Sequence, residues 1–183
     1  MTVTSPRVSV VVGNPKPGSR TLTAALHVVR RLSGDEASEG DLHVLDLATL
    51  GPALLDWKDP AVARHAERVA AADLVVVASP TYKGSYTGLL KLFLDLLPHR
   101  GLEGCVAVPV MLGAMPGHAL AVETALRPVL TELGAAVPSS LFLVESAYDD
   151  PATYAAWGER TQPLVHALVH ALDAPRESRE KVA

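Results

Sequence analysis

Hydroxyl and basic residues cluster directly after the first apolar run of this 183-residue chain. Residues 13–18 are rich in Gly and Pro, and Ser19-Arg20-Thr21 then opens a helical pattern. A helix N-terminus offers unpaired backbone N–H groups and a partial positive charge, and both favour a bound anion. Ser19 and Thr21 add hydroxyl donors, and Arg20 adds a forked cation that fits phosphate oxygens. These residues predict a phosphate site, although Ser and Thr also cap helices routinely.

Two sharper phosphate motifs are absent from this loop. A nucleoside-triphosphate loop requires Gly-Lys followed by Ser or Thr, whereas this chain has Gly18-Ser19-Arg20. A dinucleotide fingerprint requires three glycines in the pattern Gly-x-Gly-x-x-Gly, and only Gly13 and Gly18 are present. The loop therefore predicts an anion site without the signature of either class.

Two further loops offer groups that suit a flat ligand with polar edges. Pro80, Thr81, Tyr82 and Lys83 follow an apolar run that reads as a strand buried on both faces. Tyr82 is able to stack on a planar heterocycle or lie edge-on to it; the alternative is that Tyr82 packs at the sheet edge and Lys83 is solvated. Another loop, over residues 113–117, follows a later apolar run and begins with Gly113-Ala114. Because the loops after strands one, three and four of a doubly wound sheet converge, we expect one crevice lined by all three.

Other reactive residue types do not form a recognisable catalytic or metal centre. Tyr86 stands where a nucleophile elbow needs Ser, so a serine hydrolase is not expected. Cys105 lies in an apolar strand pattern, which favours a buried thiol over a nucleophile. His166 and His170 share a helix face but have no third ligand nearby in the sequence, which favours surface or packing roles over a metal site. We therefore name no catalytic residue and no metal ligand.

Strand-like and helix-like segments alternate along the whole chain. We expect strands over residues 7–12, 42–47, 73–79, 105–112 and 140–144. We expect helices over residues 21–32, 60–72, 89–97 and 118–133, and a last helix from Pro151 that Pro163 kinks or splits. This alternation predicts an α/β fold: a doubly wound five-stranded parallel sheet of flavodoxin-like order 2-1-3-4-5, with helices on both faces. One domain is expected over residues 1–174, with a disordered tail over residues 175–183.

Composition and charge exclude several classes of protein. Apolar residues make up 49% of the chain and charged residues 20%, as in an ordinary globular domain. The net charge of −4 argues against a nucleic-acid-binding surface. No apolar run approaches the roughly 20 residues that cross a bilayer, and the N-terminus lacks a signal pattern. A single cysteine fits a reducing compartment, which favours a cytoplasmic protein. From the net charge and the apolar runs, we expect that it binds neither nucleic acid nor membranes.

The expected helix from Leu89 to Leu97 is apolar nearly all round. Only Lys91 and Asp95 are charged, and they lie one turn apart. A helix packed only on its own sheet should present a wide polar face. We therefore expect the second side of this helix to be buried against another subunit, in a homodimer or homotetramer. Cover by the C-terminal helix is the alternative.

The three loops together resemble the NADPH-dependent FMN reductase family of flavodoxin-like proteins. The resemblance runs from Gly13 to about Val144 and is strongest to the reductases that supply reduced flavin to sulfonate monooxygenases. It rests on Ser19-Arg20-Thr21, on the pattern Tyr-x-x-x-Tyr-x-Gly-x-Leu-Lys from Tyr82 to Lys91, and on residues 121–130. It implies that Ser19, Arg20 and Thr21 hold the phosphate of FMN. It also implies that the isoalloxazine is bordered by Pro80, Thr81, Tyr82, Lys83, Gly113 and Ala114.

The resemblance also implies a function: hydride transfer from NADPH or NADH to FMN, in which the cofactor carries the chemistry. A flavin-dependent monooxygenase is then an expected partner. Two alternatives stay open, namely a reductase of quinones or azo dyes that retains FMN, and a non-enzymatic flavodoxin-type electron carrier. Thr124 stands where some sulfonate-system relatives carry Tyr or His, so release and retention of FMN both stay open. Pro128 removes a helical donor, and we expect an irregular helix near Thr124.

Overall fold

The fold is built on one parallel sheet. The computed structural model describes residues 5–33 and 42–173. Its strands are β1 (Val8–Val12), β2 (Leu42–Asp46), β3 (Leu74–Pro80), β4 (Val106–Gly113) and β5 (Leu141–Val144). They pair in parallel in the order β2-β1-β3-β4-β5. The predicted flavodoxin-like topology is confirmed, whereas the expected tail at residues 175–183 lies outside the described residues.

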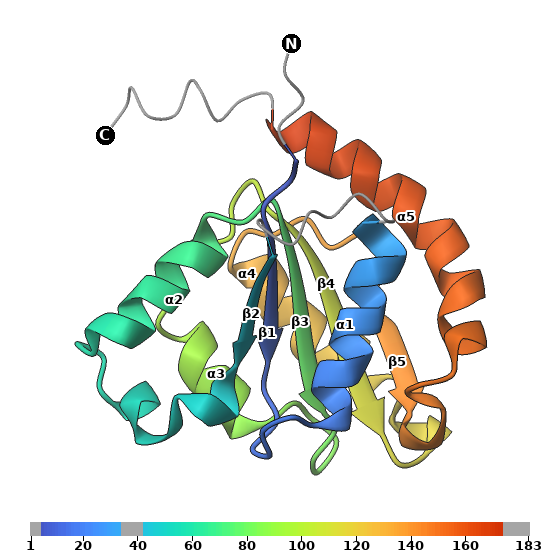
Figure 1. Cartoon of the computed structure of the whole chain (residues 1–183), viewed down its shortest axis with the longest axis horizontal. Coiled ribbons are helices and arrows are strands. Elements are labelled where there is room, and N and C mark those ends of the chain that lie inside the picture. The colour runs from blue at the N-terminus through green and yellow to red at the C-terminus, as the bar shows by residue number, and fades with distance from the viewer. Residues whose placement is uncertain (1–4, 34–41, 174–183) are drawn as a thin grey trace.

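Helices cover both faces of this sheet (Figure 1). One apolar core lies under α1 (Arg20–Ser33) and α5 (Pro151–Asp173). The other lies under α2 (Pro60–Ala70), α3 (Gly88–Leu94) and α4 (Arg127–Glu132). Strands β1, β3 and β4 are buried along their whole length, as expected for strands covered on both sides. This arrangement places the loops after β1, β3 and β4 at one edge of the sheet.

The α3 helix is shorter than predicted and is largely covered within its own chain. Leu90, Phe93 and Leu94 are buried, and only Leu92 among its leucines is exposed, at 36%. The cover comes from two 3₁₀ turns that the sequence reading missed, Leu47–Thr49 and Gly51–Leu55, and not from the C-terminal helix. The all-round apolar pattern therefore has an explanation within one chain, and assembly through this helix stays a prediction.

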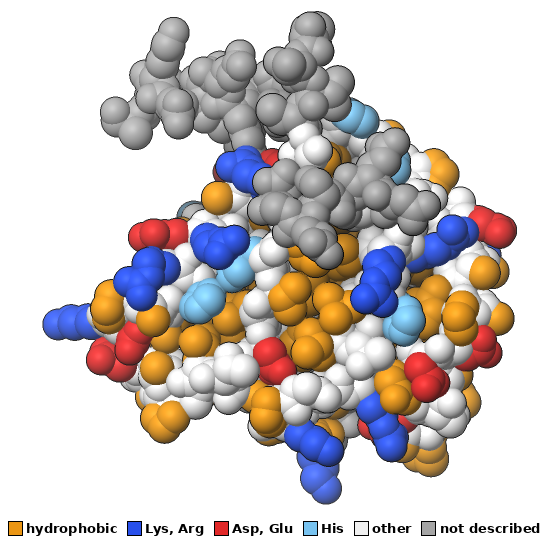
Figure 2. Space-filling model, viewed as in Figure 1, with side chains coloured by type: hydrophobic (Ala, Val, Ile, Leu, Met, Phe, Trp, Pro, Cys, Tyr) orange, Lys and Arg blue, Asp and Glu red, His pale blue; other side chains and the backbone are white. Residues whose placement is uncertain are grey.

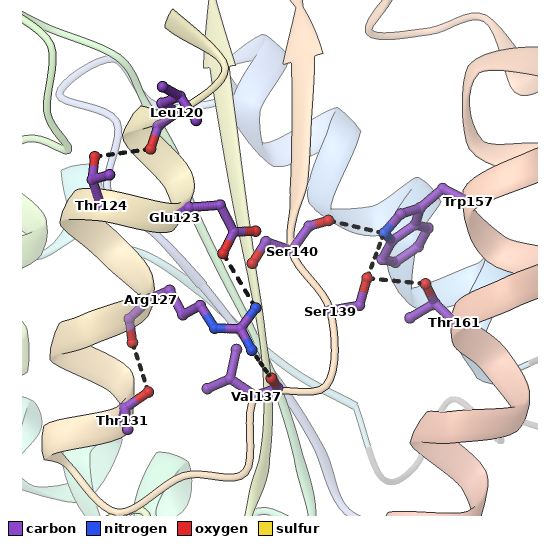
Figure 3. A network of polar contacts seen from close by, with 10 residues as sticks. All are labelled: Leu120, Glu123, Thr124, Arg127, Thr131, Val137, Ser139, Ser140, Trp157 and Thr161. Atoms are coloured by element: carbon purple, nitrogen blue, oxygen red, sulfur yellow. Dashed lines mark hydrogen bonds and ion pairs between the residues drawn. The ribbon is translucent and has the colours of Figure 1, made fainter.

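The helix before β5 contains the expected irregularity. Residues Val122–Leu126 form a π-helical segment that leads into α4, and the backbone N–H of Arg127 donates to the carbonyl of Val122. Pro128 follows at once and has no N–H to continue the regular pattern, which agrees with the prediction. The guanidinium of Arg127 donates to Glu123 at 3.2 Å and to the carbonyl of Val137 at 2.8 Å (Figure 3). These contacts tie the π-helical segment to the chain just before β5.

The α5 helix fixes the start of β5 from the other side. The indole N–H of Trp157 donates to Ser139 Oγ and to the carbonyl of Ser140, both at 3.0 Å (Figure 3). The prediction that Pro163 splits this helix is wrong, because α5 runs continuously past it (Figure 1). Pro163 is exposed, and so is Glu159 one turn earlier, so water can satisfy the carbonyl that the proline leaves unpaired.

The surface carries no concentrated positive charge on the face shown in Figure 2. Lys and Arg side chains are scattered around its margin, and hydrophobic side chains gather between them. This distribution on the visible face agrees with the net charge of −4. Within the described ranges, none of the helices combines the length and the apolar character that crossing a bilayer requires.

Candidate active site

The loop after β1 is held by hydrogen bonds between its own side chains and the start of α1. Ser19 caps the helix, since its Oγ accepts from the N–H of Leu22 at 3.3 Å. Asn14 donates from Nδ2 to Thr21 Oγ1 at 3.0 Å and accepts from the N–H of Lys16 at 2.9 Å. In both hydroxyls the oxygen is the acceptor, so each O–H remains able to donate to an anion. The capping role and the predicted anion role of Ser19 and Thr21 are therefore compatible.

Two contacts place this loop against its neighbours. The N–H of Gly18 donates to Asp46 Oδ2 at 3.0 Å, which ties the loop to the end of β2. Gly13 lies so close to α3 that a Cβ at this position would be 2.4 Å from Leu90 Cβ. The hydroxyl of Thr87 donates to the carbonyl of Gly13 and also caps α3. The loop after β1 and the loop before α3 thus form one packed unit.

The loop after β3 ends in a tight two-residue turn. Tyr82 and Ser85 exchange backbone hydrogen bonds of 2.9 and 3.1 Å. Lys83 and Gly84 between them both have positive φ, at 53° and 79°, as a type I′ turn requires. Tyr82 is 52% exposed, so about half of its surface is open to solvent, and its place beside a planar ligand stays a prediction. Lys83 is exposed, in agreement with the alternative that it is solvated.

The loop after β4 is organised by packing. Gly113 is buried, and a Cβ there would lie 2.9 Å from Phe142 Cζ. The need for glycine at this position thus comes from the contact with β5. Ala114, next in the chain, is exposed. That Gly113 and Ala114 border a flavin stays a prediction.

A cavity of about 300 Å³ lies between the first two loops and the end of β5. This volume is at the lower end of ordinary small-molecule sites. The cavity brings together five predicted residues, Ser19, Arg20, Thr21, Pro80 and Tyr82, whereas Thr81, Lys83, Gly113 and Ala114 do not line it. Lining residues that the sequence reading missed are Asn14, Lys16, Gly18, Leu112 and Glu145.

Arg20 lies at the mouth of this cavity and contacts the turn after β5. Its Nη1 is 3.5 Å from Glu145 Oε2, and its guanidinium carbon is 5.7 Å from the centre of the Tyr148 ring. Both side chains of the ion pair are well exposed, at 63% for Arg20 and 40% for Glu145. The pair is therefore weak, and the guanidinium is free to exchange partners. Among the described residues, no group of three or more acidic, His or Cys side chains could hold a metal ion.

Comparison with known proteins agrees with this geometry. The sheet order, with a cavity beside the loop after β1 at the carboxyl edge of the sheet, defines a flavodoxin-like protein. A model of the NADPH-dependent FMN reductase family matches residues 6–149. The chain belongs to this family, and the resemblance seen in the sequence is confirmed.

Three relatives illustrate the match. The FMN reductase (NADPH) of Escherichia coli K12 is 35% identical over 129 residues, which cover 70% of this chain and 68% of the relative. The NADH-dependent FMN reductase SfnF of Pseudomonas putida is 36% identical over 152 residues, covering 78% and 80%. The solved apo structure of the NADH:FMN oxidoreductase EMOB superposes with a TM-score of 0.73 at 32% identity, covering 94% of this chain and 89% of the other.

The residues of the cavity fit FMN. Two hydroxyls, the N-terminus of α1, Lys16 and Arg20 surround the position where a phosphate monoester would be bound. Pro80, Tyr82 and Leu112 give the cavity an apolar and aromatic wall beside this polar end, as an isoalloxazine requires. The polar and apolar ends lie within one cavity, which is the arrangement that a mononucleotide needs.

Proposed function

We propose that this chain is an NAD(P)H-dependent FMN reductase. The observation that carries the proposal is the cavity that Ser19, Arg20 and Thr21 line together with Pro80 and Tyr82. Bound FMN supplies the hydride acceptor, and reduced nicotinamide supplies the hydride. The protein's part is to bind the phosphate, to hold the ring plane against Pro80 and Tyr82, and to leave one ring face open to the nicotinamide. The exposure of Tyr82 supports such an open face.

The reaction needs no acid or base from the protein, because a hydride moves directly between two cofactors. The side chains contribute distance and orientation. Family relatives include both NADPH-dependent and NADH-dependent enzymes, so either nicotinamide is a candidate donor. A spectrophotometric assay with FMN and each nicotinamide tests the proposal. Oxidation of neither NADPH nor NADH with FMN present would refute it.

Arg20→Ala tests the phosphate site directly. Loss of a hydrogen-bonded cation should weaken FMN by about 10- to 100-fold, while riboflavin, which has no phosphate, should bind as before. Arg30→Ala is a matched control, because Arg30 is exposed at the other end of α1. Titration of flavin fluorescence measures the dissociation constants of both flavins for the wild type and the two variants. Equal losses for FMN and riboflavin in the Arg20 variant would remove the phosphate assignment.

Release of reduced FMN to a flavin-dependent monooxygenase is the proposed physiological role, with a cytoplasmic location. The alternatives are retention of FMN for reduction of quinones or azo dyes, and one-electron carriage. Release is supported by the two cations at the phosphate end, Arg20 and Lys16, which are exposed, although the hydroxyls of Ser19 and Thr21 beside them are buried. Purification without added flavin distinguishes release from retention: a colourless protein agrees with release, and a yellow protein with stoichiometric FMN contradicts it.

Assembly into a homodimer or homotetramer through the 89–97 segment is also proposed. Leu92 supports it as the exposed leucine of α3, with the Lys91–Asp95 ion pair beside it. Leu92→Glu should shift the protein toward monomer in analytical ultracentrifugation. An unchanged sedimentation coefficient for this variant would contradict assembly through α3.

A further inference from the structure

Glu145 is the one acidic side chain among the described residues that line the cavity. Its neighbours there are hydroxyl, amide, basic and apolar groups. A carboxylate is a poor neighbour for a phosphate monoester, which carries a charge of about −1.5 to −2 at neutral pH. Its presence at the phosphate end of the cavity therefore calls for an account beyond FMN binding alone.

The backbone turn that carries Glu145 is anchored to the rest of the structure. It begins the 3₁₀ turn Glu145–Ala147 directly after β5. The Tyr154 hydroxyl of α5 donates to the carbonyl of Tyr148, and the N–H of Asp150 donates to the carbonyl of Ala147 at 3.3 Å. The turn is thus anchored by contacts that do not involve the cavity, and these contacts fix the backbone from which the Glu145 side chain extends.

The partner of Glu145 is the same guanidinium that the phosphate would use. Arg20 Nη1 is 3.5 Å from Glu145 Oε2, and the Tyr148 ring from the same turn supports the guanidinium carbon at 5.7 Å. Arg20 therefore has a docking position on the turn after β5 when no phosphate is bound. Because exposed ion pairs shift an equilibrium by no more than about fivefold, a phosphate is able to displace the carboxylate from Arg20.

We propose that Glu145 competes with the phosphate of FMN for Arg20 and thereby keeps FMN dissociable. This inference rests on the proposed function and names the residue that sets flavin affinity within it. When FMN leaves, Arg20 returns to Glu145 and Tyr148, so the cation is never left unpaired. The same exchange weakens FMN relative to a site with a free arginine. Riboflavin engages neither group, so its affinity is independent of Glu145.

Glu145→Gln tests the competition because it keeps the shape of the side chain and removes its charge. FMN should bind about three- to tenfold tighter to this variant, from the freed guanidinium and the lost repulsion together, with riboflavin unchanged. Glu103→Gln is the matched control. Glu103 pairs with Arg100 at 3.0 Å with similar exposure, at 43%, and lies before β4 at the opposite edge of the sheet. Isothermal titration with each flavin gives the constants without any need for turnover.

A second arm separates competition from direct repulsion. In an Arg20→Ala background, Glu145→Gln should tighten FMN less than it does in the wild type, because only the lost repulsion remains when the group for which the carboxylate competes is gone. A gain that persists in full in this background would overturn the competition. Unchanged FMN binding in the single Glu145→Gln variant would also overturn it, and weaker binding would overturn it and make Glu145 a positioning residue for Arg20. Failure of the wild-type chain to bind either flavin would instead refute the proposed function itself.

Discussion

Gly13→Ala should destabilise the protein through a single misplaced methyl group. The new Cβ would lie 2.4 Å from Leu90 Cβ and 3.2 Å from Leu90 Cα, against about 3.4–4 Å for an ordinary contact. Leu90 is fully buried, and its N–H is held by Thr87 Oγ1 at 3.1 Å, so α3 has to move as a unit. Overpacking of this kind costs about 1–3 kcal/mol. Separating Gly13 from Thr87 adds about 1 kcal/mol for a lost hydrogen bond.

The expected loss for Gly13→Ala is thus about 2–4 kcal/mol in the free energy of unfolding. Urea titration followed by circular dichroism measures it. Gly88→Ala is the matched control, since Gly88 opens α3 and its Cβ would meet nothing within 4 Å. That variant should be neutral or up to about 1 kcal/mol more stable. If the free energy of unfolding of Gly13→Ala were within about 0.5 kcal/mol of the wild-type value, the conclusion that Gly13 and Leu90 cannot move apart would be refuted.

Two further predictions concern the two edge strands of the sheet, β2 and β5. Burial first, and then the nearby charge of Arg68, lower the pKa of His43 to about 4. Since the unfolded chain binds this proton near pH 6.5, stability should fall as the pH drops from about 6.5 toward 4, and His43→Gln should flatten that slope in urea titrations. Trp157→Phe removes the donor to Ser139 and Ser140 and should lower the free energy of unfolding by about 1–2 kcal/mol. A loss below about 0.3 kcal/mol, which is roughly the error of such measurements, would contradict the anchoring of β5 by this residue.

The sheet could be predicted because its signals are local. β1 and β3 each contain three consecutive valines, Val10–Val12 and Val75–Val77, and such apolar runs are typical of strands that are buried on both faces. Their alternation with helical segments then restricts the order to few topologies. The two 3₁₀ turns at Leu47–Thr49 and Gly51–Leu55 were missed because segments this short have no periodicity to detect. Their apolar residues find a place only once α3 is packed on the sheet.

The candidate site was predictable to the extent that its chemistry lies within single loops. Ser19, Arg20 and Thr21 are adjacent in the chain, and their types alone indicate an anion. Glu145 is far from them in sequence, and nothing beside it marks a ligand. An acidic residue at the carboxyl end of a predicted strand was the available signal, because every strand end in such a sheet faces the same edge. Which strand end faces Arg20 depends on how α1 crosses the sheet, and only the packed structure gives that.

Rigid and exchangeable parts of the site are separable by experiment. Gly13 lies in backbone packed against α3, so a change there moves the wall of the cavity and should weaken FMN and riboflavin together. Arg20, at the start of α1, and Glu145, on the turn after β5, are exposed side chains, so changes to them should alter only the response to phosphate. If Gly13→Ala discriminated between the two flavins, the loop would be acting through its charge and not through its position. The division between a packed frame and an exchangeable ion pair would then be wrong.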